Sequence, residues 1–357
     1  FTGGGSGGHL YPGIALAQVL ADDYHLEPHF LCGELMAERI LSKSGFASHS
    51  MPTRPGQGAG GLLRTWHQLT TLVRELKPVV TIGLGGGASL LPALVSLRSG
   101  APLFVLEQNR VLGRTNRWLL GRARRGFLSF PGHGQGLRER HRCVRLGCPV
   151  RRDFVPTPLR EGPPHLLILG GSQGSEQLNQ LMQEALPYLG ELGRVLSVTH
   201  VCGPGKNGRL SEAYAKEKVE AQVMEYLENP IEAFREASLV LARAGGSTVA
   251  ELAAVGRGAL LLPYPHHRDR QQFHNAAVLE KAGAAEVIAP KPRVLAERLR
   301  WTLGDAARLH SMARQARQLG LPQAAREVAR VMATHLECAT DAATVSSRAV
   351  EPEETIL

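Results

Sequence analysis

Short apolar runs alternate along the chain with longer segments in which apolar residues recur at helical spacing. Continuous apolar runs of this length, next to Gly or Pro, are typical of strands buried on both faces of a parallel sheet. We predict strands at 29–32, 79–84, 102–106, 165–169, 239–242 and 259–262. We predict helices at 14–20, 90–97, 176–186 and 248–255. Strands that alternate with helices at this spacing indicate an α/β fold with doubly wound parallel sheets.

The same order of strand, glycine turn and helix occurs twice, which predicts two domains. Phe1 and Thr2 resemble the end of a strand before the glycine-rich turn at 3–9, so we expect the opening residues of that strand to be missing. The second unit begins with the strand at 165–169, after a linker rich in Gly and Pro. We therefore place one Rossmann-like domain at 1–147 and a second at 148–337, facing one cleft.

The C-terminal region has a different composition. Its helices, within 293–337, are rich in Ala, Arg and Leu, and we expect them to close the second domain and to return to the first. Residues 338–357 contain Ser, Thr and the sequence EPEE, and we expect this tail to be disordered.

Candidate chemistry concentrates at 243–275. Two glycines turn the chain from the preceding strand into the helix at 248–255, which Ser247 or Thr248 can cap. A strand that breaks at small residues into a helix presents free N–H groups and the positive end of the helix dipole, which suit a phosphate. Glu251 follows one turn later, where its carboxylate can accept hydrogen bonds from a vicinal diol such as ribose.

The loop after the strand at 259–262 is rich in polar groups. These are His266, His267, Asp269, Gln271, Gln272 and Asn275. Ligands of open α/β sheets bind beyond the carboxyl ends of the strands, so this loop and the one before it should line one crevice. The alternative is that Glu251 only interacts with the helix dipole and that the glutamines only begin a solvated helix.

The first glycine turn also fits a dinucleotide-binding motif. Gly3, Gly5 and Gly8 have the GxGxxG spacing after a strand, with Glu34 as a late candidate for the acidic residue that binds ribose. No GK[ST] sequence follows, which excludes a P-loop. A nicotinamide-dependent dehydrogenase would more often contain one such domain than two.

Composition limits the class of protein. A chain of 357 residues with 43% hydrophobic residues can form two cores. The five cysteines lack CxxC spacing, so we expect reduced thiols and no structural zinc. No apolar run reaches the roughly 20 residues of a membrane helix, and we expect no signal peptide. The net charge of +9 indicates an acidic partner, but an aromatic content of 5% and the lack of RNA-binding signatures argue against nucleic acid.

A basic, partly apolar surface is predicted in the first domain. The segment 61–78 carries Leu62, Leu63 and Trp66 among several cations, and 117–125 adds RWLLGRARR. This mixture favours peripheral binding to an anionic membrane surface. The alternative is an ordinary amphipathic helix packed against the sheet.

Six motifs, taken in order, resemble glycosyltransferase family 28. They are GGGSGGHLYPG, LEQNRVLGRTNRWL, GCPVR, GGSQGSEQLN, RAGGSTVAEL and HHRDRQQFHNA, and the resemblance covers residues 1–335. It implies a GT-B fold, with the acceptor on the first domain, the UDP-sugar mainly on the second and a C-terminal helix that crosses back. It also implies inverting transfer of GlcNAc from UDP-GlcNAc to the 4-hydroxyl of the muramyl sugar of lipid I (undecaprenyl-pyrophosphoryl-MurNAc-pentapeptide), which makes lipid II for peptidoglycan.

The resemblance implies a set of donor-binding residues. They are Ser6, Gly7, Gly8, Asn109, Arg151, Ser172, Leu227, Gly246, Ser247, Glu251, Gln271, Gln272 and Asn275. Within this set, Glu251 matches the ribose contact, Arg151 and the Leu227 backbone match the uracil neighbourhood, and Ser172 serves the phosphates together with the amides at 246–247. Gln271 and the Asn109 amide match contacts to the sugar hydroxyls. Gln272 and Asn275 match residues that support the loop carrying Gln271.

Two residues are candidates for the base that removes the proton from the acceptor hydroxyl. His9, at the first glycine turn, matches a residue regarded as acid/base or pyrophosphate-binding, and an ordinary imidazole has a pKa of about 6.5. Glu107 would need a pKa raised by burial. We favour His9, since a glycine-flanked turn can present an imidazole without burying it; the alternative is a phosphate-facing histidine that transfers no proton.

The sequence departs from the family pattern at two places. Residues 85–89 read GGGAS where the family has a GGY-type turn, which leaves the acceptor contacts open, and Cys148 replaces the usual Asn. No DxD sequence is present, so we expect no metal and no cofactor, and assign the leaving group to helix N-termini. The resemblance further implies a peripheral location on the cytoplasmic face of the cell membrane, and proteins of cell-wall synthesis and division as partners.

Three other functions share parts of this pattern. A different UDP-sugar GT-B transferase with a lipid acceptor would keep the donor motifs. A UDP-GlcNAc 2-epimerase would need further acid/base carboxylates in the cleft. A non-catalytic nucleotide-sugar-binding regulator would keep Glu251 and lose the base, so the presence of His9 and Glu107 argues against it.

Overall fold

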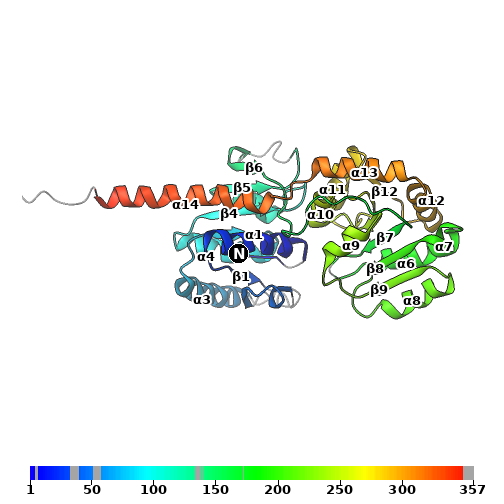
Figure 1. Cartoon of the computed structure of the whole chain (residues 1–357). Helices are drawn as coiled ribbons and strands as arrows, with labels where there is room; N and C mark the ends of the chain where they lie inside the picture. The colour runs from blue at the N-terminus through cyan, green and yellow to red at the C-terminus, as the bar shows by residue number, and fades with distance from the viewer. Residues whose placement is uncertain are drawn as a thin grey trace, which may run out of the picture.

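The computed structural model contains two lobes, each built on a parallel sheet with helices on both faces (Figure 1). It describes residues 1–4, 7–32, 40–50, 58–132, 138, 140–171 and 173–348, without the side chains of 58–59 and 337–348. This architecture confirms the predicted fold class.

The N-terminal lobe has one sheet whose central strand is the very short segment around Thr2. Thr2 bridges to Leu31 on one side and to Gly83 on the other, and its N–H donates to Ile82 O at 2.8 Å. The sheet therefore runs β2, β1, Thr2, β3, β4, β5, β6, with every printed pairing parallel. The strands are β1 (His29–Cys32), β2 (Ala47–Ser50), β3 (Thr81–Gly83), β4 (Leu103–Glu107), β5 (Arg125–Leu128) and β6 (Cys143–Arg145). The helices are α1 (Gly7–Tyr24), α3 (Gly58–Leu76), α4 (Leu90–Arg98) and α5 (Arg114–Leu120), with short 3-10 turns at Gly87–Ser89 and Arg140–Arg142.

The C-terminal lobe has a parallel sheet in the order β12-β11-β10-β7-β8-β9, the strand order of a Rossmann fold. Its strands are β7 (His165–Leu169), β8 (Ser197–Val201), β9 (Glu220–Met224), β10 (Leu239–Ala242), β11 (Ala259–Leu261) and β12 (Ala285–Val287). Its helices are α6 (Glu176–Ala185), α7 (Leu192–Val195), α8 (Asn207–Lys216), α9 (Pro230–Glu236), α10 (Gly246–Val255), α11 (Gln271–Lys281), α12 (Pro292–Leu303) and α13 (Ala306–Leu319), with a 3-10 turn at Leu186–Tyr188.

Two helices begin earlier than the sequence predicted. Helix α1 begins at Gly7 instead of residue 14, so His9 lies in its first turn and Pro12 lies inside it. Helix α10 begins at Gly246, with Gly245 as its N-cap and no side-chain cap, so the predicted capping by Ser247 or Thr248 is wrong. In both places the helix begins at a glycine, and the first N–H groups of a helix have no partner within the helix.

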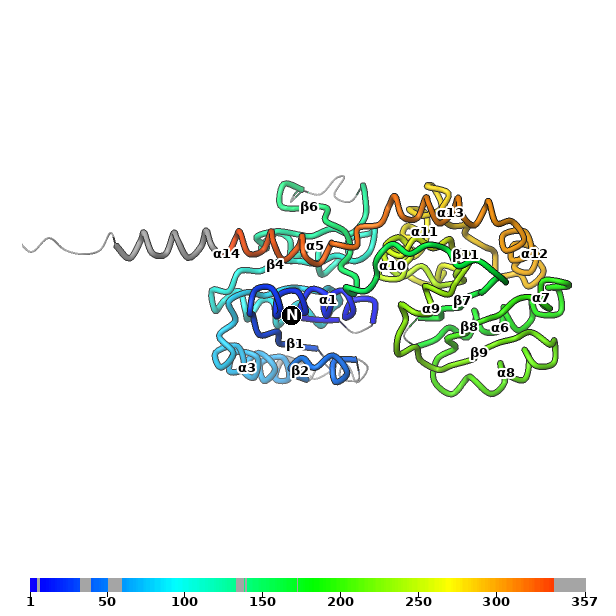
Figure 2. The backbone as a smooth tube through the Cα atoms, in the orientation of Figure 1, coloured from blue at the N-terminus to red at the C-terminus, as the bar shows by residue number. Residues whose placement is uncertain are grey.

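The last helix joins the two lobes. After α13, the chain crosses to α14 (Ala324–Arg348), which lies beside α1 on the N-terminal lobe (Figure 2). Ala325, Val328 and Met332 of α14 belong to the same core cluster as Leu16 and Phe104. The predicted return of the C-terminal helix is thus confirmed. The backbone of 338–348 is helical, where we expected disorder, and 349–357 lie outside the described residues.

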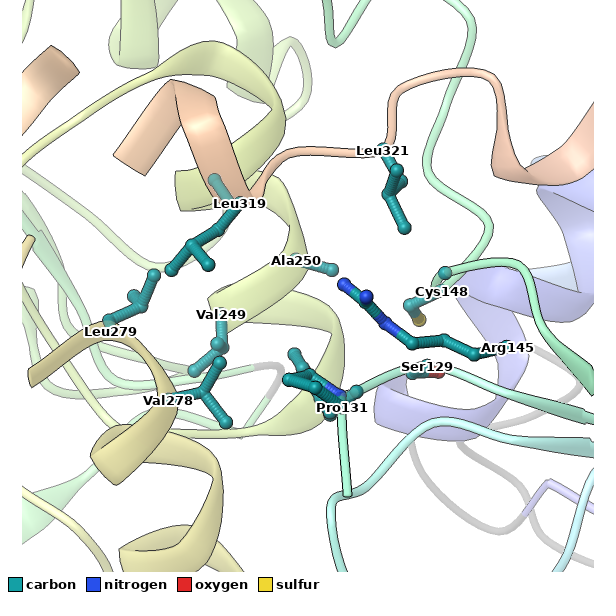
Figure 3. A pocket seen from close by; sticks show the side chains of 13 residues that line it. Ser129, Pro131, Arg145, Cys148, Val249, Ala250, Val278, Leu279, Leu319 and Leu321 are labelled. Atoms are coloured by element: carbon teal, nitrogen blue, oxygen red, sulfur yellow. The ribbon is translucent and has the colours of Figure 1, made fainter. Parts of the chain in front are cut away.

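Two crossings of the chain form the junction between the lobes, at 146–153 and at 320–323. A small cavity of about 20 Å³ lies there, with Arg145 of β6 and Cys148 of the first crossing on one side and Val249 and Ala250 of α10 on the other (Figure 3). Cys148 is buried, and burial raises the pKa of its thiol to about 12, so the thiol stays neutral. Here Cys148 acts as a small apolar side chain in the junction.

Candidate active site

In each sheet there is one pair of neighbouring strands from which the chain continues outward in opposite directions, which we call the switch point of that sheet. The two switch points face the space between the lobes. In the C-terminal lobe the point lies between β7 and β10, beyond which come the glycine loop at 170–175 and the start of α10. In the N-terminal lobe it lies between Thr2 and β3, beyond which come Gly3 and Gly4 and the loop at 84–87. Ligands of doubly wound folds bind at such points, so the fold itself defines a candidate site.

The N-terminus of α10 touches the loop that follows β4 of the other lobe. A Cβ added to Gly246 would lie 2.2 Å from Gln108 O, so only glycine permits this approach. The Gln108 side chain is 1% exposed, and its amide has no hydrogen-bond partner among the described residues. A buried amide without a partner costs free energy until a water or a bound molecule satisfies it.

Asn275 connects the same loop to the C-terminal lobe. Its Oδ1 accepts from the N–H of Arg110 at 2.7 Å, while its Nδ2 donates to Asn109 Oδ1 at 3.1 Å and to Ala244 O at 3.0 Å. Asn275 is fully buried. One amide therefore fixes the sugar-contact candidate Asn109 against the turn that precedes α10.

Glu251 lies on the second turn of α10, close to Arg151. Its Oε1 is 3.7 Å from Arg151 Nη2, and the Glu251 side chain is 13% exposed. Burial raises the pKa of Glu251 to about 7, and the nearby Arg151 guanidinium opposes this rise. The carboxyl group is therefore poised to gain or lose its proton near neutral pH.

Two tyrosines bridge the lobes beside this pair. Tyr11 Oη on α1 and Tyr226 Oη, in the loop after β9, lie 2.8 Å apart. The Arg151 guanidinium lies 5.1 Å from the Tyr11 ring centroid, and Lys43 lies over the Tyr226 ring at 4.8 Å. The neighbouring Leu227 packs against the core of the C-terminal lobe. The uracil candidates Arg151 and Leu227 therefore lie beside this contact between the lobes.

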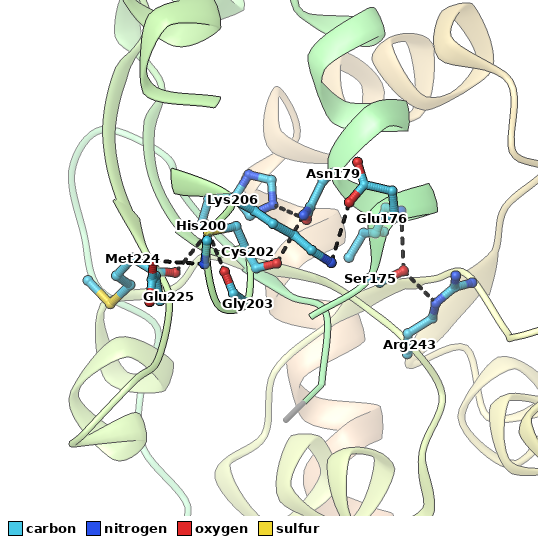
Figure 4. Close-up of polar contacts among 12 residues, drawn as sticks. Ser175, Glu176, Asn179, His200, Cys202, Gly203, Lys206, Met224, Glu225 and Arg243 are labelled. Atoms are coloured by element: carbon cyan, nitrogen blue, oxygen red, sulfur yellow. Dashed lines mark hydrogen bonds and ion pairs between the residues drawn. The ribbon is translucent and has the colours of Figure 1, made fainter. Parts of the chain in front are cut away.

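Arg243, which follows β10, holds the end of the glycine loop at Ser175. The Arg243 guanidinium donates to Ser175 Oγ at 3.0 Å (Figure 4). It also donates to Gln177 Oε1 at 2.9 Å and to Leu262 O at 2.9 Å. Ser175 Oγ in turn caps α6 by accepting from Leu178 N at 3.3 Å. Arg243 therefore connects the ends of β7, β10 and β11.

A buried network supports the other side of this glycine loop (Figure 4). His200 Nε2 lies 3.1 Å from Asn179 Oδ1, and Asn179 Nδ2 donates to Cys202 O at 2.9 Å. A Cβ on Gly174 would lie 2.1 Å from Cys202 O, so the two loops are in direct backbone contact. Burial lowers the pKa of His200 to about 4, which keeps the imidazole neutral and able to bond both Asn179 and Tyr214.

The two base candidates have different surroundings. His9 lies in the first turn of α1, where it is partly exposed, and burial of part of the side chain lowers the pKa of its imidazole. Glu107 is 2% exposed, and burial raises the pKa of its carboxyl group. Its oxygens accept from the N–H groups of Asn109 at 3.0 Å and Gly113 at 2.9 Å, and from Asn116 Nδ2 at 3.0 Å. Glu107 is therefore engaged in holding its own loop.

The remaining predicted site residues lie in two places. Gln271 begins α11, and its Nε2 lies 3.1 Å from His267 Nδ1, while Gln272 Oε1 accepts from Tyr264 N at 2.9 Å. Gly7 and Gly8 form the first turn of α1. Ser6, Ser172 and the dinucleotide-motif residue Glu34 lie outside the described residues. The tyrosine-less turn at 85–89 packs on the first glycine loop, since a Cβ on Gly3 would lie 2.5 Å from Ser89 Cβ.

Sequence reasoning gave no role to three residues that shape this site, although Arg243 opens the stretch at 243–275 that it singled out. Arg243 directly follows the apolar run at 239–242, and a cation at the carboxyl end of a buried strand is a signal that could have identified it. Tyr11 and Tyr226 lie 215 positions apart, and nothing in the local sequence indicates that their hydroxyl groups meet.

The described residues contain no group of three or more His, Cys, Asp or Glu that could hold a metal ion. Among the helices in the described part of the chain, none is long and apolar enough to cross a membrane.

Comparison with known proteins places the chain in a family. The model of the glycosyltransferase family 28 N-terminal domain matches residues 1–127, and that of the C-terminal domain matches residues 165–328. A curated protein of Hahella chejuensis, named UDP-N-acetylglucosamine--N-acetylmuramyl-(pentapeptide) pyrophosphoryl-undecaprenol N-acetylglucosamine transferase, is 37% identical over 343 residues, which cover 91% of this chain and 94% of that protein. A protein of the same name from Geobacter metallireducens is 33% identical over 93% of this chain and 97% of its own length.

Solved structures agree on the fold. The crystal structure of Acinetobacter baumannii MurG matches with a TM-score of 0.75 and 26% identity, covering 93% of this chain and 98% of that one. A UDP-GlcNAc 2-epimerase from Neisseria meningitidis matches with a TM-score of 0.66 at 12% identity, over 93% of this chain and 97% of that chain, a likeness that shows the shared fold alone. With both of its domains matched by the family models, this chain belongs to glycosyltransferase family 28 and has the GT-B fold.

Proposed function

We propose that this chain transfers GlcNAc from UDP-GlcNAc to the 4-hydroxyl of a MurNAc-pentapeptide-pyrophosphoryl-undecaprenol acceptor, which converts lipid I to lipid II. The observation that carries the proposal is that two Rossmann-type switch points face each other, one with a buried carboxylate beside a free helix N-terminus and the other with His9. The named function of relatives that align along more than nine-tenths of the chain supports it.

In this proposal the C-terminal lobe, residues 148–337, binds the donor. Glu251 accepts from the ribose hydroxyls, and the free N–H groups of Gly246 and Ser247 bind the diphosphate, because α10 has no side-chain cap to compete for them. Arg151 and the Leu227 backbone bind the uracil end, beside the two bridging tyrosines.

The sugar end of the donor lies where the lobes meet. Gln271 and Asn109 contact the GlcNAc hydroxyls, while Asn275 and Gln272 hold those two elements in place through the hydrogen bonds described above. Ser6, Gly7, Gly8 and Ser172 complete the donor set that the family resemblance implies.

His9 is the base of the proposed mechanism. Its lowered pKa keeps the imidazole unprotonated at neutral pH, so Nδ1 or Nε2 can take the proton of the acceptor hydroxyl as that oxygen bonds to C1 of GlcNAc. The bond from C1 to the UDP oxygen breaks, and the diphosphate leaves with its charge at the α10 N-terminus. Glu107 has a positioning role, since its oxygens already accept several donors from its own loop.

The N-terminal lobe, residues 1–147, binds the acceptor and associates with the membrane. Helix α3 buries Leu69 and Val73 against the lobe. This face of the helix packs on the protein, as an ordinary amphipathic helix does, and is not available to a membrane. Its first turns leave Leu62 and Leu63 60% and 70% exposed, next to the exposed Arg64. These residues suit peripheral docking on the anionic cytoplasmic face of the cell membrane. Proteins of cell-wall synthesis and division are the implied partners there.

The experiment that tests the proposal supplies UDP-GlcNAc labelled in the sugar, with and without a short-chain lipid I analogue, in the presence of EDTA. We expect label to appear in the acceptor only when both substrates are present, and EDTA to leave most activity in place, because helix ends stabilise the leaving group. Formation of UDP-ManNAc without acceptor would instead identify an epimerase, and UDP binding without turnover would identify a regulator.

A further inference from the structure

A wide cationic groove lies beside the sugar end of the cleft, between α5 of the N-terminal lobe and the loop before α11 of the C-terminal lobe. Its volume is about 1210 Å³. Five arginines line it: Arg114, Arg117, Arg122, Arg138 and Arg268. All five are exposed, and none forms an ion pair with a carboxylate of the described residues.

The groove contains little negative charge of its own. Asp269 is the carboxylate in its lining, and Asp269 Oδ1 accepts from the N–H of Gln271 at 3.3 Å. Like charges gathered in one concave surface raise the local concentration of anions. Guanidinium groups bind carboxylates through paired hydrogen bonds, so the lining suits a ligand with carboxylate groups. The Arg122 guanidinium lies 3.7 Å from the ring centroid of the exposed Trp118, which adds an apolar wall.

The position of the groove indicates which part of the acceptor reaches it. Gln271, the candidate for contacting the transferred sugar, lines the groove and bonds His267, another lining residue. The acceptor hydroxyl at C4 of the muramyl ring must meet this sugar, and the peptide is carried by the lactyl group on the neighbouring C3. The diphosphate is attached at C1, on the opposite side of the ring. A peptide that leaves the ring beside the reacting hydroxyl therefore begins close to this groove.

We infer that the groove between α5 and the 267–271 loop binds the anionic pentapeptide of the acceptor through its carboxylates. This inference rests on the proposed function. It also reassigns the basic stretch at 117–125, which we had placed on the membrane surface. Arg117, Trp118 and Arg122 line a space shared with the C-terminal lobe, whereas the exposed Leu62 and Leu63 lie on α3.

The test compares three acceptors with one short lipid chain: the pentapeptide form, the same form with its peptide carboxylates converted to carboxamides, and a peptide-free form. The variant is Arg117→Gln combined with Arg268→Gln, and the matched control is Arg300→Gln, an exposed arginine of α12. Short-chain acceptors are assayed without vesicles, and binding to vesicles containing anionic lipid is measured separately by sedimentation.

We expect the double variant to raise KM for the pentapeptide acceptor by about tenfold, the size expected when charged hydrogen bonds are lost. KM for the carboxamide and peptide-free acceptors, KM for UDP-GlcNAc and vesicle binding should stay unchanged, as should every parameter of Arg300→Gln. An equal rise for all three acceptors would show that the groove binds the diphosphate or sugar, and would overturn the inference. Unchanged KM, or loss of vesicle binding alone, would overturn it as well. Failure of the proposed function would be distinct, since the wild-type protein would then transfer no sugar to any acceptor.

Discussion

The two switch points are built in different ways. In the C-terminal lobe, side chains connect the loops through hydrogen bonds. Arg243 bonds residues that follow β7 and β11, and the buried pair of His200 and Asn179 supports the glycine loop. In the N-terminal lobe, the described loops pack backbone against backbone, with Gly3 close to Gly85 O and Ser89. The difference indicates that the donor half is preorganised by fixed hydrogen bonds, which is where electrostatic stabilisation of a leaving group is most effective.

The largest expected effect comes from the N-terminal switch point. His9→Ala should lower kcat by about 100-fold or more, because general-base catalysis contributes on that scale. The fall of kcat at acidic pH should also disappear. In the wild type this fall should lie below about 6.5, since burial lowers the pKa of His9.

Glu107→Gln is the paired variant for this prediction. Glu107 now accepts hydrogen bonds from Asn109, and the NH2 group of a glutamine would face these same N–H groups. The change should therefore disturb the Asn109 loop and raise KM for UDP-GlcNAc. If the acidic limb of kcat instead disappears in Glu107→Gln and persists in His9→Ala, Glu107 is the base.

The second effect concerns pH and the donor site. A folded-state pKa of about 7 means that Glu251 becomes protonated as the pH falls through 7, and a protonated carboxyl group is a weaker acceptor for ribose hydroxyls. UDP affinity should therefore fall by up to about tenfold per pH unit below 7. Glu251→Gln should lose this part of the pH dependence, which separates it from titration of UDP itself. A wild-type profile identical to that of Glu251→Gln would contradict the assignment.

The same pKa makes an opposite prediction for stability. Because the folded-state pKa lies above the ordinary value of 4.5, burial favours the neutral carboxyl group. The free energy of unfolding should therefore decrease as the pH rises from 4.5 through 7, and urea titrations of wild type and Glu251→Gln should converge at low pH. Convergence at high pH instead would mean that the carboxylate is stabilised by Arg151.

A smaller effect should follow from loosening the donor loops. Arg243→Gln removes hydrogen bonds to Ser175, Gln177 and Leu262 and should weaken UDP binding by about tenfold, measured by calorimetry. Arg235→Gln, which removes an exposed pair with Glu232, is the matched control and should leave UDP binding unchanged. Equal behaviour of the two variants would show that preorganisation by Arg243 is unimportant.

The smallest effect concerns the contact between the lobes. Tyr226→Phe removes the hydroxyl that meets Tyr11 but keeps the ring beside Lys43, so KM for UDP-GlcNAc should rise by about threefold. Tyr188→Phe, at an exposed tyrosine whose ring lies beside Arg293 of α12, should have no effect. A tenfold or larger rise in Tyr226→Phe would indicate that the hydroxyl contacts substrate directly.

The sequence predicted β7 and β10 of the C-terminal lobe at their observed bounds, but it misplaced the starts of two helices. The apolar runs at 165–169 and 239–242 match β7 and β10, because a strand buried on both faces must be continuously apolar. The starts of α1 and α10 were misplaced because glycine has a low helix propensity, and the close approach of Gly246 to Gln108 that requires glycine is a tertiary contact. The strands at 47–50, 125–128, 143–145, 197–201, 220–224 and 285–287 were not predicted. Those at 47–50 and 220–224 lie at sheet edges and carry polar residues, so they lack the continuous apolar run of a buried strand.

Site residues could be predicted from the sequence where each lies within one continuous family motif. Contacts between segments that are far apart in the sequence could not be predicted. Glu251, Asn109 and Gln271 follow from motifs, but the junction of Asn109 with Asn275 joins residues 166 positions apart. The surroundings of His9 and Glu107 also depend on folding. Burial moves both pKa values, and the bonds that engage Glu107 come from residues whose loop conformation the sequence does not specify.

The division of labour between the lobes is tested most directly by titrating UDP, in one calorimetric series, into the wild type, His9→Ala and Glu251→Ala. Loss of charge-assisted hydrogen bonds to two hydroxyls should cost about 2 kcal/mol, so Glu251→Ala should bind UDP about 30-fold more weakly. His9→Ala should bind UDP as the wild type does and yet turn over hardly at all. Wild-type affinity in a folded Glu251→Ala protein, or a large loss of UDP affinity in His9→Ala, would contradict the assignment of the donor to the C-terminal lobe and the base to the N-terminal lobe.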